Sequence, residues 1–290
     1  MNFNRLFHWI LCFTASYLLS CRDHPNPDIA PGSISARLRV KALTLQLPNN
    51  TAKISAFRYD QQGRLRVIHT YQSPDSTVAD IENSVYLYDA QNRLVQLRRE
   101  AILFPLGSLP NPVELYTFGY NAVGMLTDLA YLNGFSLTFG YDNANRLTNS
   151  RREWGYRRYE LRGTDTLTYT GNNVTRVLTN LFFTTNTRSV STYSYDTKVN
   201  PFYGFFVIPA PYPEGFVNLE RTLGGTVKTY FGGVDNLLNL SQNNVLSESS
   251  TLIGTVTYQY DYNSANLPAV RRAMANGVLK ETVLFEYEAY

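Results

Sequence analysis

The sequence predicts an all-β protein, a single antiparallel β-meander of hairpins that forms a rolled sheet or a barrel-like sheet. Strand-favouring residues are abundant, with 22 tyrosines and 16 phenylalanines among 290 residues. Apolar and polar residues alternate in short runs, as in a sheet covered on one face. A hairpin motif also recurs at unequal spacings of 21 to 32 residues. Such spacings favour a meander with variable loops over a rigid solenoid.

The motif reads aromatic-x-Tyr-(Asp/Asn)-x-x-(Gly/Asn)-x-Leu, and four copies begin at Phe57, Tyr86, Phe118 and Phe139. A type I turn with a G1 bulge begins with Asp or Asn, whose side chain accepts hydrogen bonds from backbone N–H groups. The position after the turn requires a residue that tolerates positive φ. The predicted turn pairs are Asp60 with Gly63, Asp89 with Asn92, Asn121 with Gly124, and Asp142 with Asn145.

The turn also predicts a register. Counted outward from the turn at 61–63, the expected cross-strand pairs are Asp60 with Arg64, Tyr59 with Leu65, and Phe57 with Val67. The apolar members then share one face and the charged members the other, with ion pairs at the hairpin mouths. Arg58 would face Arg66, an unfavourable like-charge pair. The repeated Tyr and Asp residues could instead form a binding or catalytic row, but turn chemistry already accounts for each repeated position.

The N-terminal segment predicts export. Arg5 precedes an apolar run too short to span a bilayer, and Leu18–Cys21 resembles a bacterial lipobox. We therefore expect a lipoprotein signal peptide at 1–20, a lipidated Cys21 with a flexible tether at 21–33, and a β domain at 34–290. The alternative is an ordinary signal peptide with an incidental cysteine.

Later segments continue the pattern with variations. Tyr169–Val174 resembles a shortened hairpin, and Tyr193–Asp196 and Tyr258–Asp261 restore the aromatic-x-Tyr-Asp signature. Asn276-Gly277 fits a two-residue type I′ turn. That turn would set Met274 opposite Leu279 and Arg272 opposite Glu281. The aromatic and proline-rich run 202–213 is expected to plug the core, although a membrane-contacting loop is an alternative.

Composition excludes several kinds of chemistry. Cleavage before Cys21 leaves 25 basic and 23 acidic residues, a balance that by itself indicates no polyanion partner. The same cleavage leaves Cys21 as the one cysteine, and the lipid would be attached to its sulfur. Neither a disulfide nor a thiolate metal site is therefore expected. His69 alone cannot build a multi-histidine centre. We expect no cofactor, no metal site and no catalytic residue.

A basic and aromatic patch is the candidate ligand site. Its residues are Arg151, Arg152, Trp154, Tyr156, Arg157, Arg158 and Tyr159. Interleaved cations and aromatic rings suit an anionic glycan, lipid headgroups or single-stranded nucleic acid. The alternative is a solvated strand pair in which arginine stems cover aromatic faces.

Paired carboxylates are the remaining enzyme hypothesis. The repeated turn does not explain Glu153, Glu160, Asp165 or Glu220. Two of them across a cleft would suit glycoside hydrolysis, while solvated surface charges are the simpler interpretation.

The hairpin Tyr59-Asp60-x-x-Gly63-Arg64-Leu65 resembles the YD repeat of the Rhs family, whose repeats build a β shell around a toxin. A closer resemblance is to uncharacterised Bacteroidota lipoproteins. They combine a lipobox, degenerate Tyr-x-Tyr-Asp hairpins and a Tyr-Asp-x-Lys-x-Asn-Pro segment, here Tyr195–Pro201. The likeness covers most of residues 35–290. It implies a cell-envelope β domain with a porin-like fold and transfers no catalytic residue.

These observations predict a lipid-anchored cell-envelope protein at the outer membrane, acting as a non-catalytic binding or structural module. Its expected partners are the membrane, through Cys21, and a glycan or an envelope protein, with no nucleic acid. One alternative is a carbohydrate-active enzyme with a carboxylate pair. The other is an outer-membrane β-barrel, whose strands should carry apolar bands outward.

Overall fold

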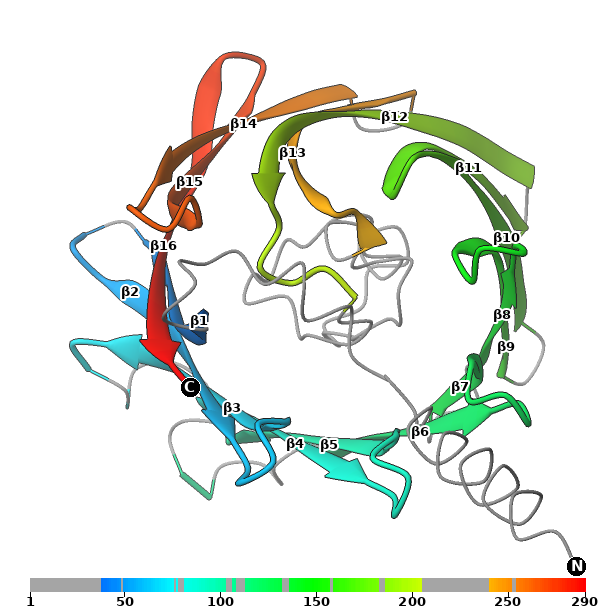
Figure 1. The fold of residues 1–290 in the computed structure, drawn as a ribbon, viewed down its shortest axis with the longest axis horizontal. Helices are drawn as coiled ribbons and strands as arrows, with labels where there is room; N and C mark the ends of the chain where they lie inside the picture. Colours follow the sequence, from blue (N-terminus) through cyan, green and yellow to red (C-terminus); the bar gives the residue numbers. More distant parts are fainter. Residues whose placement is uncertain are drawn as a thin grey trace, which may run out of the picture.

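Sixteen antiparallel strands close into one barrel in the computed structural model (Figure 1). The structure describes residues 38–47, 49–75, 77, 81–102, 106–107, 113–131, 136–156, 159–182, 186–204, 240–251 and 254–290. The prediction of an all-β meander is confirmed, and the sheet is closed. The predicted signal peptide, Cys21 and the tether lie outside the described residues.

The strands follow the chain in order around the barrel. They are β1 (Leu38–Gln46), β2 (Ala52–Tyr59), β3 (Leu65–Ser73), β4 (Ile81–Tyr88), β5 (Leu94–Ile102), β6 (Val113–Tyr120), β7 (Leu126–Tyr131) and β8 (Ser136–Tyr141). They continue as β9 (Leu147–Tyr156), β10 (Tyr159–Thr170), β11 (Asn173–Phe182), β12 (Asn186–Val199), β13 (Asn243–Ser250), β14 (Gly254–Tyr262), β15 (Pro268–Ala275) and β16 (Val278–Ala289). Each strand pairs with its sequence neighbours, and β1 pairs with β16 to close the barrel.

Because the strands alternate in direction, the connections alternate between the two ends of the barrel. We call one of these the repeat end, since it carries the β2–β3, β4–β5, β6–β7 and β8–β9 turns of the motif. The β10–β11 and β14–β15 turns lie at the same end. The first strand begins there and the last strand finishes there. Both ends of the barrel's chain therefore lie at the repeat end.

The repeated turns share one hydrogen-bond pattern. In the first, the Gly63 N–H donates to the Asp60 carbonyl at 3.0 Å, and the Asp60 N–H donates to the Arg64 carbonyl at 2.9 Å. The Asp60 carboxylate accepts from the backbone N–H groups of Gln62 and Arg64, at 2.9 and 3.0 Å. Gly63, Asn92, Gly124 and Asn145 all adopt positive φ, between 60° and 84°. Gly and Asn are the residues that reach this conformation at least cost.

Beyond the turn, the expected register is wrong by one residue. Tyr59 pairs with Leu65 as expected, but Arg58 pairs with Val67 and Phe57 with Ile68. The reason is a bulge at Arg66, which removes the expected Arg58–Arg66 opposition. Both Leu65 and Ile68 thereby reach the buried face. The same one-residue shift follows the other three motif turns and the β14–β15 turn.

Two of the later copies form no turn at their aspartate. Strand β12 runs through Asp196 to Val199, and β14 runs through Asp261 to Tyr262. The β14–β15 turn begins instead at Asn263, whose carbonyl accepts from the Asn266 N–H at 2.9 Å. Asn266 has a φ of 60°. A fifth motif turn therefore lies two residues beyond the expected position.

The last hairpin is partly as expected. Asn276 and Gly277 both adopt positive φ, as a type I′ turn requires, and Met274 pairs with Leu279. A register shift then places Ala273, not Arg272, opposite Glu281. The expected Arg272–Glu281 opposition is wrong for the same reason as before, a bulge beside the turn.

The apolar core lies inside the barrel near the repeat end. The chain after β12 turns into the interior (Figure 1), and the Phe202 ring stacks on Phe57 with centroids 6.0 Å apart. Phe202 also contacts Phe285 at 6.4 Å. The largest buried cluster, to which Phe57 belongs, draws on β1 to β8 and β16. Residues that alternate with this inward face form the outer wall.

Candidate functional site

A ring of tyrosine hydroxyls joins successive hairpins at the repeat end. Each hydroxyl donates to a backbone carbonyl of the preceding strand. The pairs are Tyr59 with Val40 (2.6 Å), Tyr88 with Leu65 (2.8 Å), Tyr120 with Leu94 (2.8 Å), Tyr141 with Leu126 (2.7 Å), Tyr169 with Leu147 (2.7 Å), Tyr195 with Val174, and Tyr287 with Pro268 (2.8 Å). Burial raises the pKa of Tyr88 to about 12, so its hydroxyl keeps the proton that it donates.

The motif arginines complete this ring. Arg64 pairs with Asp60 at 2.7 Å and lies over the Tyr88 ring of the next hairpin, 4.5 Å from its centroid. Arg93 and Arg146 lie in the same way over the tyrosines that follow them, at 5.1 and 5.0 Å. These contacts use the repeated Tyr, Asp and Arg side chains to hold neighbouring hairpins together.

The two leading arginines of the predicted patch face opposite sides of the barrel wall. The Arg151 side chain is 62% exposed and forms an ion pair with Glu153, while the Arg152 side chain is 1% exposed and pairs with Asp165. Strand alternation separates them, because neighbouring residues point to opposite faces. Arg157 and Arg158 lie outside the described residues. Trp154, Tyr156 and Tyr159 are described only as backbone, in the paired ends of β9 and β10.

Asp165 organises a buried polar group on the inner wall. Its carboxylate accepts from Ser150 at 2.9 Å and from Thr179 at 2.6 Å, in addition to Arg152. A second buried group joins Lys53 and Arg99 to Glu82, at 3.2 and 3.1 Å. Buried charges are tolerated when they are paired in this way. The inner wall thus carries ion pairs as well as the apolar cluster.

Glu248 is a third buried group, on β13. Its side chain is 0% exposed and accepts a 3.0 Å hydrogen bond from the Tyr193 hydroxyl. Burial raises the pKa of Glu248, although hydrogen bonds from Tyr193 and Ser191 act in the opposite direction. Sequence reasoning missed this residue, since a lone Glu in a Ser-rich strand reads as a surface charge.

The carboxylates of the enzyme hypothesis are dispersed. Glu153 lies on the outer wall with Arg151, and Asp165 lies on the inner wall with Arg152. A barrel wall separates these two carboxylates, so they cannot flank one glycosidic bond. The Glu160 side chain and all of Glu220 lie outside the described residues.

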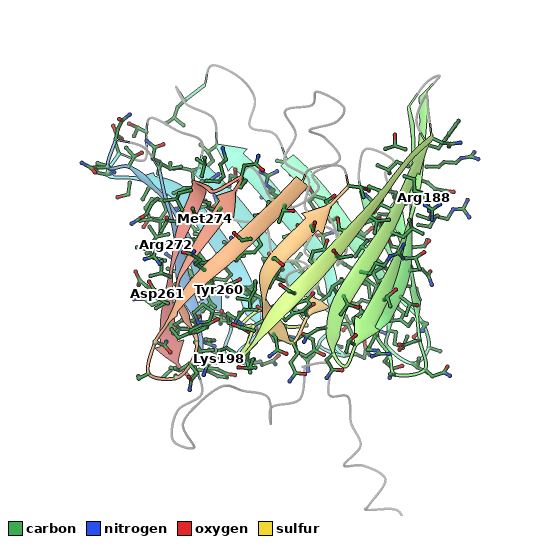
Figure 2. The ribbon with its side chains drawn as sticks, turned by 90° about the horizontal axis from the view of Figure 1, so that it is seen from above. Arg188, Lys198, Tyr260, Asp261, Arg272 and Met274 are labelled. Carbon is green, nitrogen blue, oxygen red and sulfur yellow. The ribbon has the colours of Figure 1, made fainter. Side chains whose placement is uncertain are left out.

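Exposed ion pairs lie on several strands of the outer wall. Arg272 pairs with Asp261 at 2.9 Å on β14 and β15, where Figure 2 labels both, and Arg98 pairs with Glu100 at 2.9 Å on β5. Other outward pairs, on β1 and β16, are Arg39 with Glu288 (2.7 Å) and Lys41 with Glu286 (3.5 Å). The described outer wall therefore carries exposed ion pairs, together with exposed apolar residues such as Leu87 and Val113, while the inner wall near the repeat end is apolar.

Among the described residues, no three His, Cys, Asp or Glu side chains are grouped so that they could hold a metal ion. The same part of the chain contains no helix long and apolar enough to cross a bilayer.

No protein-family model and no curated protein sequence matches this chain. Solved structures do resemble its fold. A porin-like protein from Bacteroides uniformis is 14% identical, with a TM-score of 0.51 over 86% of this chain and 96% of the other. At this identity the likeness concerns the fold alone.

Two further structures align with lower TM-scores. A porin-like protein from Bacteroides vulgatus is 13% identical over 86% of this chain and 98% of the other, with a TM-score of 0.36. A chain of the TcdB2-TccC3-TEV structure is 12% identical over 80% of this chain and 14% of the other, with a TM-score of 0.28.

Proposed function

We propose that this chain is a lipid-anchored β-barrel of the bacterial cell envelope, whose barrel stands in water beside the outer membrane. Cys21 would carry the lipid, and the barrel would act as a non-catalytic scaffold or binding module. The observation that carries this proposal is the set of exposed ion pairs on the outer wall, on the far side of the sheet from an inner wall that is apolar near the repeat end.

A membrane-spanning barrel needs an apolar band about 25 Å tall facing lipid. An Arg or Lys facing lipid at the bilayer midplane costs about 2–4 kcal/mol. The outward pairs Arg272–Asp261, Arg98–Glu100 and Arg151–Glu153 would each bring one such cation into lipid. In water the same exposed pairs cost nothing and contribute up to about 1 kcal/mol each.

The position of the chain ends supports the anchor. Strand β1 begins at Leu38 at the repeat end, and residues 22–37 link it to Cys21. A lipid on Cys21 would hold the repeat end, with its ring of turns, nearer to the membrane surface than the opposite end.

An outer-membrane-spanning barrel is the second candidate. Closure into sixteen strands and the likeness to a porin-like fold favour it over an open-sheet module. Barrels of 16–18 strands include the porins, which enclose aqueous channels. In that case the outward ion pairs would have to lie outside the hydrocarbon layer.

The proposal includes no catalytic step. Its support is the separation of Glu153 from Asp165 and the use of the motif Asp and Tyr side chains in hairpin contacts.

Membrane fractionation of cells that express Cys21→Ala tests this proposal against its rival. The anchored barrel should move from the membrane fraction to the soluble fraction and remain folded without detergent. Cys12→Ala, which changes the only other cysteine, is the matched control and should leave the protein in the membrane fraction. A Cys21→Ala protein that stays in the membrane and needs detergent would establish the spanning barrel instead.

A further inference from the structure

Positive charge gathers on one part of the outer wall, over β9 to β12. We call this surface the arginine wall. It includes the outward residues Arg151, Glu153, Arg162, Arg176 and Arg188, with polar residues and the apolar Leu178 and Val190 between them. Its described side chains include four arginines and one glutamate.

The strand register places these residues in rows across the sheet. Arg151 pairs with Thr164, Thr164 with Asn180, and Asn180 with Arg188, so one row ends in an arginine on each side. The next row runs from Glu153 through Arg162 and Phe182 to Asn186. Neighbouring strands lie about 4.8 Å apart, so the cations are spread over a broad, shallow surface.

The arginine wall is accessible. Arg151, Arg162 and Arg188 are exposed, and Phe182 is 47% exposed. Figure 2 shows Arg188 projecting from the outer wall toward the end opposite Lys198, which lies near the repeat end. The surface therefore extends toward the end of the barrel that the proposed lipid would leave free.

The outer wall on β14 to β16 and β1 differs from the arginine wall in its charge pairing. On β14 to β16 and β1, the cations Arg272, Arg39 and Lys41 each pair with a carboxylate. On the arginine wall the single described carboxylate, Glu153, pairs with Arg151.

The side chains of the arginine wall indicate which class of polyanion this surface could bind. Threonine and asparagine side chains lie between the arginines and can hydrogen-bond sugar hydroxyls, while guanidinium groups suit carboxylate or sulfate groups. Single-stranded nucleic acid would require several exposed aromatic rings for base stacking, and Phe182 is the one aromatic ring described on this surface. Spread cations favour a polymer with repeating charges over a small ion in a pocket.

We propose that the arginine wall binds an anionic polysaccharide, with Arg176 and Arg188 as charged contacts and Thr164 and Asn180 as polar contacts. This site differs from the patch that the sequence predicts, because Arg152 points inward and is replaced by arginines from β10, β11 and β12. The proposal rests on the proposed function in one respect, because the arginine wall must face water, but it does not require the lipid itself.

The test is a binding titration with the full chain, extracted from the cell envelope in mild detergent. The probes are polygalacturonate, which carries carboxylates, dextran sulfate, and neutral dextran, at about 50 mM salt, where screening of exposed charges is limited. The wild type should bind at least one polyanion and not dextran. Arg176→Gln with Arg188→Gln should weaken that binding about tenfold.

The matched control is Arg58→Gln with Arg66→Gln, which removes two exposed arginines from β2 and β3. It should change the affinity less than about twofold. If Arg176→Gln disturbs folding, Asn180→Glu places an opposing charge on the same surface and should give the same loss.

Three results would overturn the proposal: no binding to either polyanion, equal losses in the two double variants, or binding to anionic lipid vesicles without binding to the polymers. Release of Cys21→Ala together with no polyanion binding would overturn this proposal and leave the anchored barrel standing, whereas retention of Cys21→Ala in the membrane would overturn the anchored barrel, so the two failures are distinguishable.

Discussion

The Tyr88 hydroxyl donates a 2.8 Å hydrogen bond to the carbonyl oxygen of Leu65, which belongs to the preceding hairpin. Strand pairing alone joins β3 to β4 along their edges, and this bond adds a side-chain link between two turns. Repetition of the link from Tyr59 to Tyr195 explains why the motif keeps a tyrosine two residues after an aromatic residue. The tyrosine holds a neighbouring hairpin, whereas the Asp and Gly or Asn residues form the turn itself.

The series of hydrogen bonds from tyrosine hydroxyls to backbone carbonyls is interrupted at Tyr262, where the acceptor is a side-chain carboxylate. The Tyr262 hydroxyl donates to Asp196, the aspartate of the copy that forms no turn. Asp196 also accepts from the Asn244 N–H at 3.1 Å, which ties β12 to β13. A degenerate repeat thus retains its contacts between hairpins after its turn has been lost.

Removal of one tyrosine hydroxyl should destabilise the barrel modestly. Tyr88→Phe leaves the ring over which Arg64 lies but removes the bond to Leu65, so the free energy of unfolding should fall by about 1 kcal/mol. Urea unfolding followed by circular dichroism measures this. Tyr290→Phe, at an exposed ring, is the control and should change stability by less than about 0.5 kcal/mol. Equal effects of the two changes would contradict the role assigned to the ring of hydroxyls.

The turn position at Asn145 should discriminate among side chains. Its φ of 60° suits Gly and Asn, while a β-branched residue is strained there. Asn145→Val should lower the free energy of unfolding by about 1–2 kcal/mol, and Asn145→Gly by less than about 0.5 kcal/mol. Ala144→Val in the same exposed turn is the control. Should both valine variants unfold at the same urea concentration, the positive-φ argument would fail.

The turn chemistry could be predicted from the sequence, but the strands beyond it could not. Asp60 and Gly63 mark the turn by residue type. The bulge that follows falls on Arg66, Val95, Thr127 and Thr148 in the four copies, and a charged, an apolar and two hydroxyl side chains give no common signal at this position. The register is set instead by which residues reach the core, and that depends on the closed sheet.

Two further features could not be predicted from the sequence. One is the closure of the barrel, and the other is which side of the barrel wall Arg151 and Arg152 each face. The Arg39–Glu288 pair joins the first and last strands, 249 residues apart. Alternation does imply that Arg151 and Arg152 face opposite sides, but only the closed sheet identifies the inner side. The partner of Arg152, Asp165, lies on the next strand, where the register set by the β9–β10 connection decides the match.

Glu248 should make stability depend on pH. Its pKa in the folded state is raised above 4.5 by burial, so the folded state retains the proton more strongly than the unfolded chain does. The contribution of Glu248 to the free energy of unfolding should therefore be greatest below pH 4.5. It should fall as the pH rises through the raised folded-state pKa. Glu248→Gln should remove that decrease, as measured by urea unfolding from about pH 4 to about pH 8. The exposed Glu286→Gln should leave it in place, and an unchanged slope in Glu248→Gln would contradict the assignment.

Gly163 should not tolerate a side chain. A Cβ there would lie 2.7 Å from Leu181 Cδ2 and 2.8 Å from Arg152 Cγ, both on the inner wall. Gly163→Ala should therefore lower the free energy of unfolding by about 1–3 kcal/mol, since the buried Arg152 must move. Thr164→Ala, at the next residue on the outer wall, provides the comparison and should cost less than about 0.5 kcal/mol. A Gly163→Ala protein as stable as the wild type would show that this wall is loosely packed.

The central claim, that the outer wall faces water, can be tested directly on the anchored protein. Thr166→Cys and Thr257→Cys place a thiol on the exposed outer wall of β10 and β14, and Cys21 is the only native cysteine beyond the predicted cleavage site. An environment-sensitive fluorophore at either position, measured in native membranes, should report a water-like emission that lipid-borne quenchers do not reduce. Blue-shifted emission quenched from the bilayer at both positions would place the wall in lipid and contradict the account.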